Sequence, residues 1–187
     1  MPPKAKYTKE QIIEVAFSMV RKDGIDILSA RSLASKLGTS TAPIFTAFSS
    51  IEEIINSVIN KSKELYKTYL NEGLKQTPPF KGAGIKYIQF AKDEPELFKL
   101  LFMAPGNNQE ATHFMPSNDE NAPKVQNALQ SFWNIPEDKA KNIYNHLAVY
   151  AHGFAVLYAQ GSSIFTMDDV CKMLSEVFMA LIGDKQK

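Results

Sequence analysis

The stretch SARSLASKLGTSTAPIFTAFSSIEEI, residues 29 to 54, decides the fold of this chain because it holds two helix starts around one abrupt turn. Ser29 has the place of a helix N-cap, with Leu28 before it and Leu33 four residues into the helix. This arrangement is typical of a hydrophobic staple, which fixes the angle at which the chain enters the helix. Gly38 ends that helix, since glycine accepts the left-handed backbone found after many helix C-termini.

A short third helix is predicted over residues 41 to 48, with Ser40 as its cap. Pro43 falls in the first turn, where backbone N–H groups have no partner in any case. The three residues 38 to 40 therefore form a turn between two helices, which is typical of a helix-turn-helix whose second helix enters the DNA major groove. An ordinary helix pair in a bundle would show the same spacing.

The composition of the third helix favours the DNA-binding interpretation. Thr41, Ala42, Thr46 and Ala47 are small, so they allow a close approach to DNA, where Thr and Ala contact thymine methyls and hydroxyls bond phosphate. We place the apolar members of the helix on its inner side: Ile44, Phe45 and Phe48. Positive charge for phosphate contact comes from Lys4, Lys6, Lys9, Arg31 and Lys36.

Helical spacing of apolar residues extends over the rest of the chain, and strand-like alternation is scarce. The first helix is predicted from a capping box at Thr8 and Gln11 to Asp23, and the fourth from a capping box at Ser50 and Glu53 to Gly73. The fold class is therefore all-α. Further helices are predicted at about 81 to 92, 94 to 103, 123 to 133, 136 to 160 and 167 to 182.

Composition bounds the compartment and the partners. The chain has 187 residues, 44% of them hydrophobic, and a net charge of +1. Residues 1 to 50 hold seven Lys or Arg against four acids, a local balance of +3. Cys171 is the single cysteine, which excludes an intrachain disulfide or a Cys-based zinc cluster. No secretory signal or apolar run of about 20 residues is present, so we expect a soluble cytoplasmic protein.

Residues 8 to 60 resemble the N-terminal domain of TetR-family transcriptional regulators. The matching features are the hydroxyl cap, an Arg two residues on, Leu-Ala, Leu-Gly, the turn Ser, aromatics seven and ten residues after Gly38, and an acidic start to the fourth helix. The remaining chain is similar to the family only in outline. The resemblance implies DNA binding by residues 1 to 50, a connecting helix over 51 to 72, and ligand binding and dimerisation by 74 to 187.

The same resemblance implies a homodimer that binds a palindromic operator in double-stranded DNA. It implies a repressor released by a small apolar or amphipathic molecule, with no cofactor, no metal and no catalytic activity. Two motifs about 34 to 36 Å apart would read two half-sites in successive major grooves. We expect DNA contacts from eight residues, Arg31 first among them: Lys6, Ser29, Arg31, Thr39, Ser40, Thr41, Ala42 and Thr46.

Three departures from the family pattern bear on DNA affinity. The family usually has Tyr at the position of Phe45, His at that of Ala47 and Lys near Ile51, and those groups commonly hold the DNA backbone. Three backbone donors are therefore missing. Phe45 and Phe48 are interpreted as packing residues rather than DNA contacts.

The second region is rich in aromatic residues, which form a core and can also line an apolar pocket. We predict that the ligand is contacted by Tyr87, Phe90, Phe102, Met103, His113, Trp133, Tyr144, His146 and Tyr150. Small and apolar residues of the last two helices predict a four-helix dimer interface. Its members are Ala148, Ala151, Ala155, Leu174, Val177, Phe178 and Leu181. The polar stretch 104 to 123 is longer than an ordinary connection, so it is either mobile or functional.

Two other classes of function were weighed. An enzyme is disfavoured because Cys171 has no nearby His, His146 and His152 are not on one helix face, and the GxG at residues 82 to 84 does not follow a strand. A helical small-molecule-binding protein that has lost DNA binding stays open, given Phe45, Ala47 and Ile51.

Overall fold

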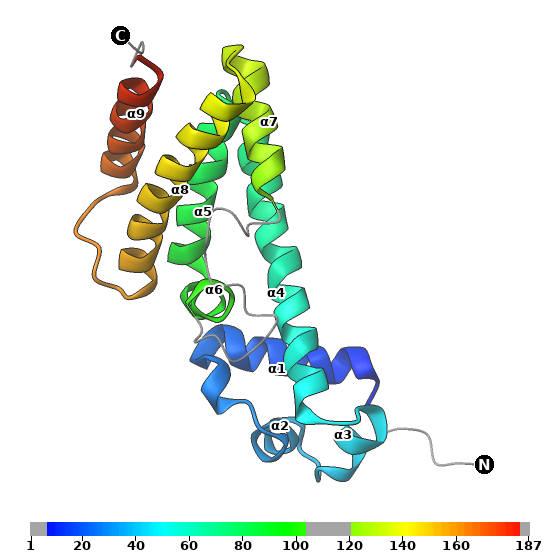
Figure 1. The fold of residues 1–187 in the computed structure, drawn as a ribbon. Helices are drawn as coiled ribbons and strands as arrows, with labels where there is room; N and C mark the ends of the chain where they lie inside the picture. The colour runs from blue at the N-terminus through cyan, green and yellow to red at the C-terminus, as the bar shows by residue number, and fades with distance from the viewer. Residues whose placement is uncertain (1–6, 104–120, 184–187) are drawn as a thin grey trace.

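The structure is a computed structural model that describes residues 7 to 103 and 121 to 183. Within these ranges it contains only helices, so the all-α prediction is confirmed (Figure 1). The elements are α1 (Lys9–Asp23), the short 3-10 helix η1 (Ile25–Ile27), α2 (Ala30–Leu37), α3 (Ala42–Ala47), α4 (Ile51–Leu74), α5 (Pro79–Asp93), α6 (Pro95–Phe102), α7 (Ala122–Trp133), α8 (Glu137–Ala159) and α9 (Met167–Gly183).

Side-chain caps set the starts of the first two helices. The Thr8 hydroxyl accepts from the Gln11 N–H (3.2 Å) and the Gln11 side chain accepts from the Thr8 N–H (2.9 Å), as predicted. At α2 the Ser29 hydroxyl accepts from the Ser32 N–H (3.1 Å), while the Ser32 hydroxyl oxygen accepts from the Ser29 N–H (2.9 Å). This second capping box was not predicted, since Ser is less usual than Glu or Gln at that position.

Two predicted caps are wrong in detail. Thr41, not Ser40, is the N-cap of α3, and it makes no side-chain cap bond because its backbone is already helical. At α4 the Ser50 hydroxyl accepts from the Glu53 N–H (3.3 Å), but the Glu53 carboxylate turns to the N–H and hydroxyl of Ser49 (2.7 and 2.9 Å). Lys9 also donates to that carboxylate (3.0 Å), which draws it toward α1 and away from the Ser50 N–H.

The long helix α4 starts beside α3 and continues to the opposite end of the molecule (Figure 1). There α5 returns along α4, and α8 packs on α5. Helices α4 and α5 touch through their backbones at Gly73 and Gly82. A Cβ atom added to Gly82 would lie 2.1 Å from the Gly73 carbonyl oxygen, and one added to Gly73 would lie 2.5 Å from the Gly82 oxygen. Any side chain at either position would force the two helices apart.

One hydrophobic cluster joins both regions, from Ile12 and Leu33 near the N-terminus to Phe98 and Phe154 in the second region. A smaller cluster around Phe80 and Phe178 lies at the N-terminal end of α5. The helices of the first region are therefore anchored on the second by continuous packing. None of the helices within the described ranges is long and apolar enough to span a bilayer.

Candidate nucleic-acid interface and ligand pocket

The turn between α2 and α3 has a hydrogen-bonded geometry that fixes the angle between the two helices. Gly38 has a left-handed backbone (φ 64°), its N–H donates to Ser35 O (3.1 Å), and the Thr39 N–H donates to Ala34 O (3.0 Å). This pair of bonds is a Schellman motif. The Tyr7 hydroxyl also donates to the Leu37 carbonyl (2.5 Å), so the N-terminal segment clamps the end of α2.

The predicted DNA-contacting residues within the described ranges lie at the end of the molecule formed by α2 and α3 (Figure 1). Lys6 is outside the described residues. Arg31, Ser40, Ala42 and Thr46 are exposed, while Thr39 and Thr41 are half-buried. The Ser29 hydroxyl caps α2, and the Thr46 hydroxyl donates to the Ala42 carbonyl (2.9 Å), so both are partly engaged inside the protein.

Phe45 is not the packing residue that the sequence predicted, since it is 50% exposed. Ile44 and Phe48 are buried four residues apart on one face of the chain. Phe45 follows Ile44 directly and so points about 100° away, toward the side of Ala42 and Thr46. The outer face of α3 therefore presents two small residues and one aromatic ring, and the helix has no charged side chain.

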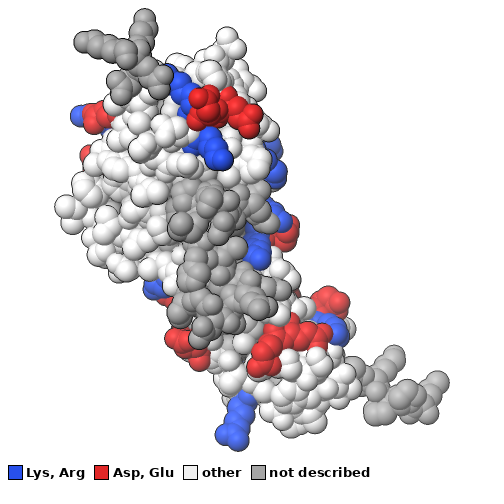
Figure 2. Space-filling view, in the orientation of Figure 1, with Lys and Arg blue, Asp and Glu red and all other residues white. Residues whose placement is uncertain are grey.

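Little positive charge surrounds this face. Lys9, which was expected to serve phosphate contacts, pairs with Glu53 (3.0 Å) and lies over the Phe48 ring (4.9 Å). Bonds from Ser49 and Lys9 hold the pKa of Glu53 down at about 2. Arg31 and Lys36 are exposed and form no ion pair within the described chain. In Figure 2 one basic side chain projects from the lower end of the molecule, with acidic side chains just above it and uncharged surface beside it.

An ion pair connects the first region to the second. Arg21 of α1 donates through Nε to Glu94 Oε2 (2.6 Å), and its terminal NH₂ group pairs with the other carboxylate oxygen. Glu94, at the junction of α5 and α6, is 4% exposed, whereas the Arg21 side chain is half-exposed. The hydrogen bonds to Glu94 raise the pKa of Arg21. Beside them the Tyr69 hydroxyl donates to Asp93 (3.3 Å), and burial raises the pKa of Tyr69 to about 12.

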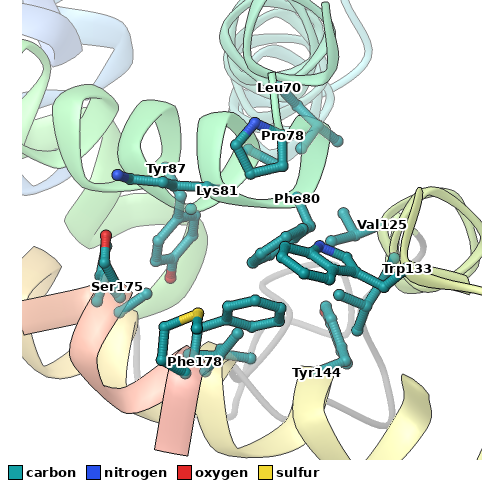
Figure 3. Close-up of a pocket in the computed structure, with 18 of the residues that line it drawn as sticks. Leu70, Pro78, Phe80, Lys81, Tyr87, Val125, Trp133, Tyr144, Ser175 and Phe178 are labelled. Atoms are coloured by element: carbon teal, nitrogen blue, oxygen red, sulfur yellow. The ribbon is translucent and has the colours of Figure 1, made fainter. Parts of the chain in front are cut away.

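The second region encloses a cavity of about 240 Å³ (Figure 3). Its walls come from α4, α5, α7, α8 and α9, and they are mostly apolar. Three predicted ligand contacts line it: Tyr87, Trp133 and Tyr144. Four residues that were predicted for the dimer interface also line it: Ala148, Ala151, Leu174 and Phe178.

The other predicted ligand contacts lie elsewhere. Phe90 is completely buried in the main cluster, and Phe102 and Met103 pack against that cluster without lining the cavity. His113 falls outside the described residues. His146 and Tyr150 line a separate shallow groove on the other side of α8, which also includes Phe165 of the connection to α9.

The structure also redistributes the predicted dimer residues. Ala151, Ala155, Leu174 and Phe178 are buried within the single chain, so they offer no surface to a second copy. Val177 and Leu181 are half-buried. The large apolar residues of α8 and α9 that are most exposed are Val149 (61%) and Met179 (57%). A helix in a monomer core has an apolar face whether its partner is its own chain or another, so spacing alone does not separate the two.

A few polar groups interrupt the second region. The Tyr87 hydroxyl lies 2.8 Å from His152 Nδ1, and burial lowers the pKa of His152. Among the described residues that line the cavity, Lys81 is the one with a charge, and Ser175 adds a hydroxyl. Sequence reasoning missed Lys81, because nothing near residue 81 in the sequence indicates that the first turn of α5 borders a cavity. The described residues contain no group of three or more His, Cys, Asp or Glu side chains placed to hold a metal ion.

No protein-family model matches the sequence, and no curated protein sequence matches it. Among solved structures, the chain is similar to a crystal structure of a TetR-like transcriptional regulator from Rhodococcus sp. RHA1. The TM-score is 0.72 over 95% of this chain and 96% of that one, with 15% sequence identity. The resemblance read from residues 8 to 60 is thus confirmed for the fold of nearly the whole chain: it is the fold of a TetR-like transcriptional regulator.

Proposed function

We propose that this protein is a DNA-binding transcriptional regulator in which a small molecule bound in the cavity changes DNA affinity. The observation that carries the proposal is the outer face of α3, where Ala42, Phe45 and Thr46 are exposed on a helix held by the Gly38 turn. A surface helix that only packs usually exposes polar or charged side chains rather than an aromatic ring. The likeness to a TetR-like regulator supports the proposal through the fold.

The proposed contacts divide between charge and shape. Arg31 and Lys36 of α2 supply the cations for phosphate, and Arg31 is the first candidate for a base contact. The outer face of α3 reads the groove by apolar contact, since methyl groups of thymine pack well against Ala, Thr and Phe side chains. Such a reader forms few hydrogen bonds to bases. Its affinity then depends on how closely the two surfaces fit.

The proposed assembly is a homodimer formed through the outer side of α8 and α9. Val149 is exposed there, and the shallow groove containing Tyr150, Phe165 and Met173 lies on the same side of α8. A two-fold pair presents two copies of α3, which suits a palindromic site. We further propose that the ligand lowers DNA affinity, which makes the protein a repressor. Coupling between two such sites is typically about 1 to 3 kcal/mol.

A DNA-binding assay tests the proposal. Duplexes that bind are selected from a randomised library, and DNA from the protein's own upstream region is tested beside them. The ionic strength is fixed at about 100 mM, because the contribution of phosphate contacts to affinity depends on salt. We expect a specific site that Arg31→Ala binds about tenfold more weakly, in line with the loss of one charged contact. Lys141→Ala, exposed on α8, is the matched control. No selected site, or equal binding by both variants, would falsify the proposal.

A second candidate is a helical ligand-binding protein without DNA binding. It is favoured by one specific observation, the engagement of Lys9 by Glu53 beside an α3 that has no charged side chain. In that case the selection yields no enriched sequence while the cavity still binds its ligand. The same two measurements therefore separate the candidates.

A further inference from the structure

The lining of the cavity is aromatic at one end. The Phe80 and Phe178 rings lie with their centroids 4.3 Å apart, and Trp133 is 5.0 Å from Phe178. These rings come from α5, α7 and α9, so three helices converge on them (Figure 3). The volume of about 240 Å³ is below the range of about 300 to 1,000 Å³ usual for drug-sized ligands. A small, largely apolar molecule fits this space.

The other end of the cavity carries the charge. Lys81 is half-buried and belongs to the first turn of α5, and Figure 3 shows it with Ser175 on the side away from Trp133. Lys81 forms no ion pair with any residue that the structure describes. A lysine near a helix N-terminus opposes the helix dipole, so its position does not help the helix. Its charge and the helix end together favour an anion.

Trp133 adds no polar contact for a ligand. Its Nε1–H is buried and has no hydrogen-bond partner among the described residues. Because almost none of this atom is accessible, a molecule in the cavity meets the apolar part of the ring instead. Lys81 and Ser175 therefore carry the polar recognition, and they favour a ligand with one negative charge.

We infer that the cavity binds an amphipathic monocarboxylic acid, with its carboxylate against Lys81 and its apolar body between Phe80, Trp133 and Phe178. A single lysine matches the single charge of a carboxylate. A phosphate carries more charge and more acceptors than Lys81 and Ser175 can serve. This inference deepens the proposed function and depends on it only for the effect of the ligand on DNA.

The test uses Trp133 as a reporter, because it is the single tryptophan of the chain and lines the cavity. Its fluorescence is titrated, without DNA, with decanoate and 4-cyclohexylbutanoate and with the matching primary alcohols. We expect at least one acid to bind at least tenfold more tightly than its alcohol. In Lys81→Met, which keeps an apolar stem, that acid should bind no better than its alcohol, while the alcohol should bind as before.

Lys141→Met is the matched control and should leave the preference for the acid unchanged. Alcohol binding by Lys81→Met, together with its helical circular dichroism, shows that the variant is folded. Three outcomes would overturn the inference: equal binding of acids and alcohols, a Lys81→Met variant that still prefers the acid, or no binding of either acid. The DNA assay is read separately. Lys81-dependent binding of an acid that leaves DNA affinity unchanged would overturn the proposed regulation and support the ligand assignment.

Discussion

The two regions of this molecule place their proposed functional residues in opposite ways. Around the Gly38 turn, short-range bonds fix the backbone, and the side chains that matter point outward from α3. Around the cavity, five helices drawn from residues 51 to 183 converge, and the side chains that line it point inward. In the first region, position in the sequence gives position on the surface. In the second region, position in the sequence gives only the helix face on which a residue lies. The helix that packs against that face decides whether the residue lines the cavity.

Residues of α8 and α9 that were predicted for the dimer interface line the cavity, and residues predicted for the pocket lie outside it. Ala148 and Phe178 line the cavity although their spacing was interpreted as a dimer face, while His146 and Tyr150 lie on the outer side of α8. All four were correctly placed on helices. Which face meets the chain's own core depends on how α8 and α9 pack, and that packing has no local signal.

Gly82→Ala should have the largest effect, and the clash that it causes lies in the second region. The new Cβ would lie 2.1 Å from the Gly73 carbonyl oxygen, so α4 and α5 must separate. We expect a loss of about 3 kcal/mol in the free energy of unfolding, at the upper end for overpacking. Urea unfolding measures it. Gly84→Ala is the control, since a Cβ there meets nothing within 4 Å. Equal losses would show that the close contact does not matter.

Removing Arg21 should have an effect of similar size, because it breaks the ion pair between the two regions. Arg21→Met leaves the Glu94 carboxylate, 4% exposed, without its partner, which costs about 3 kcal/mol for a buried charge. Glu94→Gln should cost about 1 kcal/mol, since the half-exposed Arg21 can turn to water. Denaturant unfolding of both variants measures the two losses of unfolding free energy. A larger loss for Glu94→Gln would contradict this account of the pair.

Ile51→Lys tests the DNA affinity of the first region, because it restores a cation near the proposed phosphate contacts. Ile51 is the half-buried first residue of α4. We expect DNA affinity to rise about tenfold and the slope of affinity against salt to steepen by about one. Binding titrations at several salt concentrations measure both. Asn60→Lys, exposed further along α4, adds the same charge away from α3 and should change little.

The apolar face of α3 predicts a smaller effect on affinity when thymine methyl groups are removed from the DNA. Replacing thymidine by deoxyuridine within the selected site removes methyl groups without altering base pairing. Each contacted methyl should contribute about 0.8 kcal/mol, or about fourfold in affinity. Phe45→Ala should reduce this preference, since Phe45 supplies the exposed ring. Equal binding of both DNAs by the natural protein would exclude methyl readout, while substitutions outside the site serve as the control.

The smallest predicted effect is in the acid stability of the first region. The folded pKa of Glu53 is about 2, below its ordinary value of 4.5. Glu53 therefore stabilises the fold above pH 4.5, and this contribution is lost as the pH falls toward 2. Glu53→Gln should flatten the dependence of unfolding free energy on pH in that window. Glu176→Gln, exposed on α9, should leave it unchanged. An unaltered profile for Glu53→Gln would count against the Ser49 and Lys9 bonds.

The helices were predictable because their ends carry local signals. Thr8, Ser29 and Gly38 act within a few residues of themselves, and all three have the predicted roles. Phe45 was misplaced because apolarity was interpreted as burial, although Ile44 and Phe48 already fill the inner face. The Arg21 and Glu94 pair could not be foreseen, since 73 residues separate the partners and neither carries a motif. The cavity shares this limit, as its walls come from five helices.

The contact between Gly73 and Gly82 gives α4 the mechanics of a lever. It fixes one end of the helix against α5 backbone to backbone, without side chains that could slide or compress. Ile51, at the other end, lies about 33 Å away at 1.5 Å per residue. A tilt of about 5° around this fulcrum therefore moves the end beside α3 by about 3 Å. That displacement is comparable to one base-pair step of DNA, so a small change of angle at Gly73 is large beside the DNA contacts that we propose.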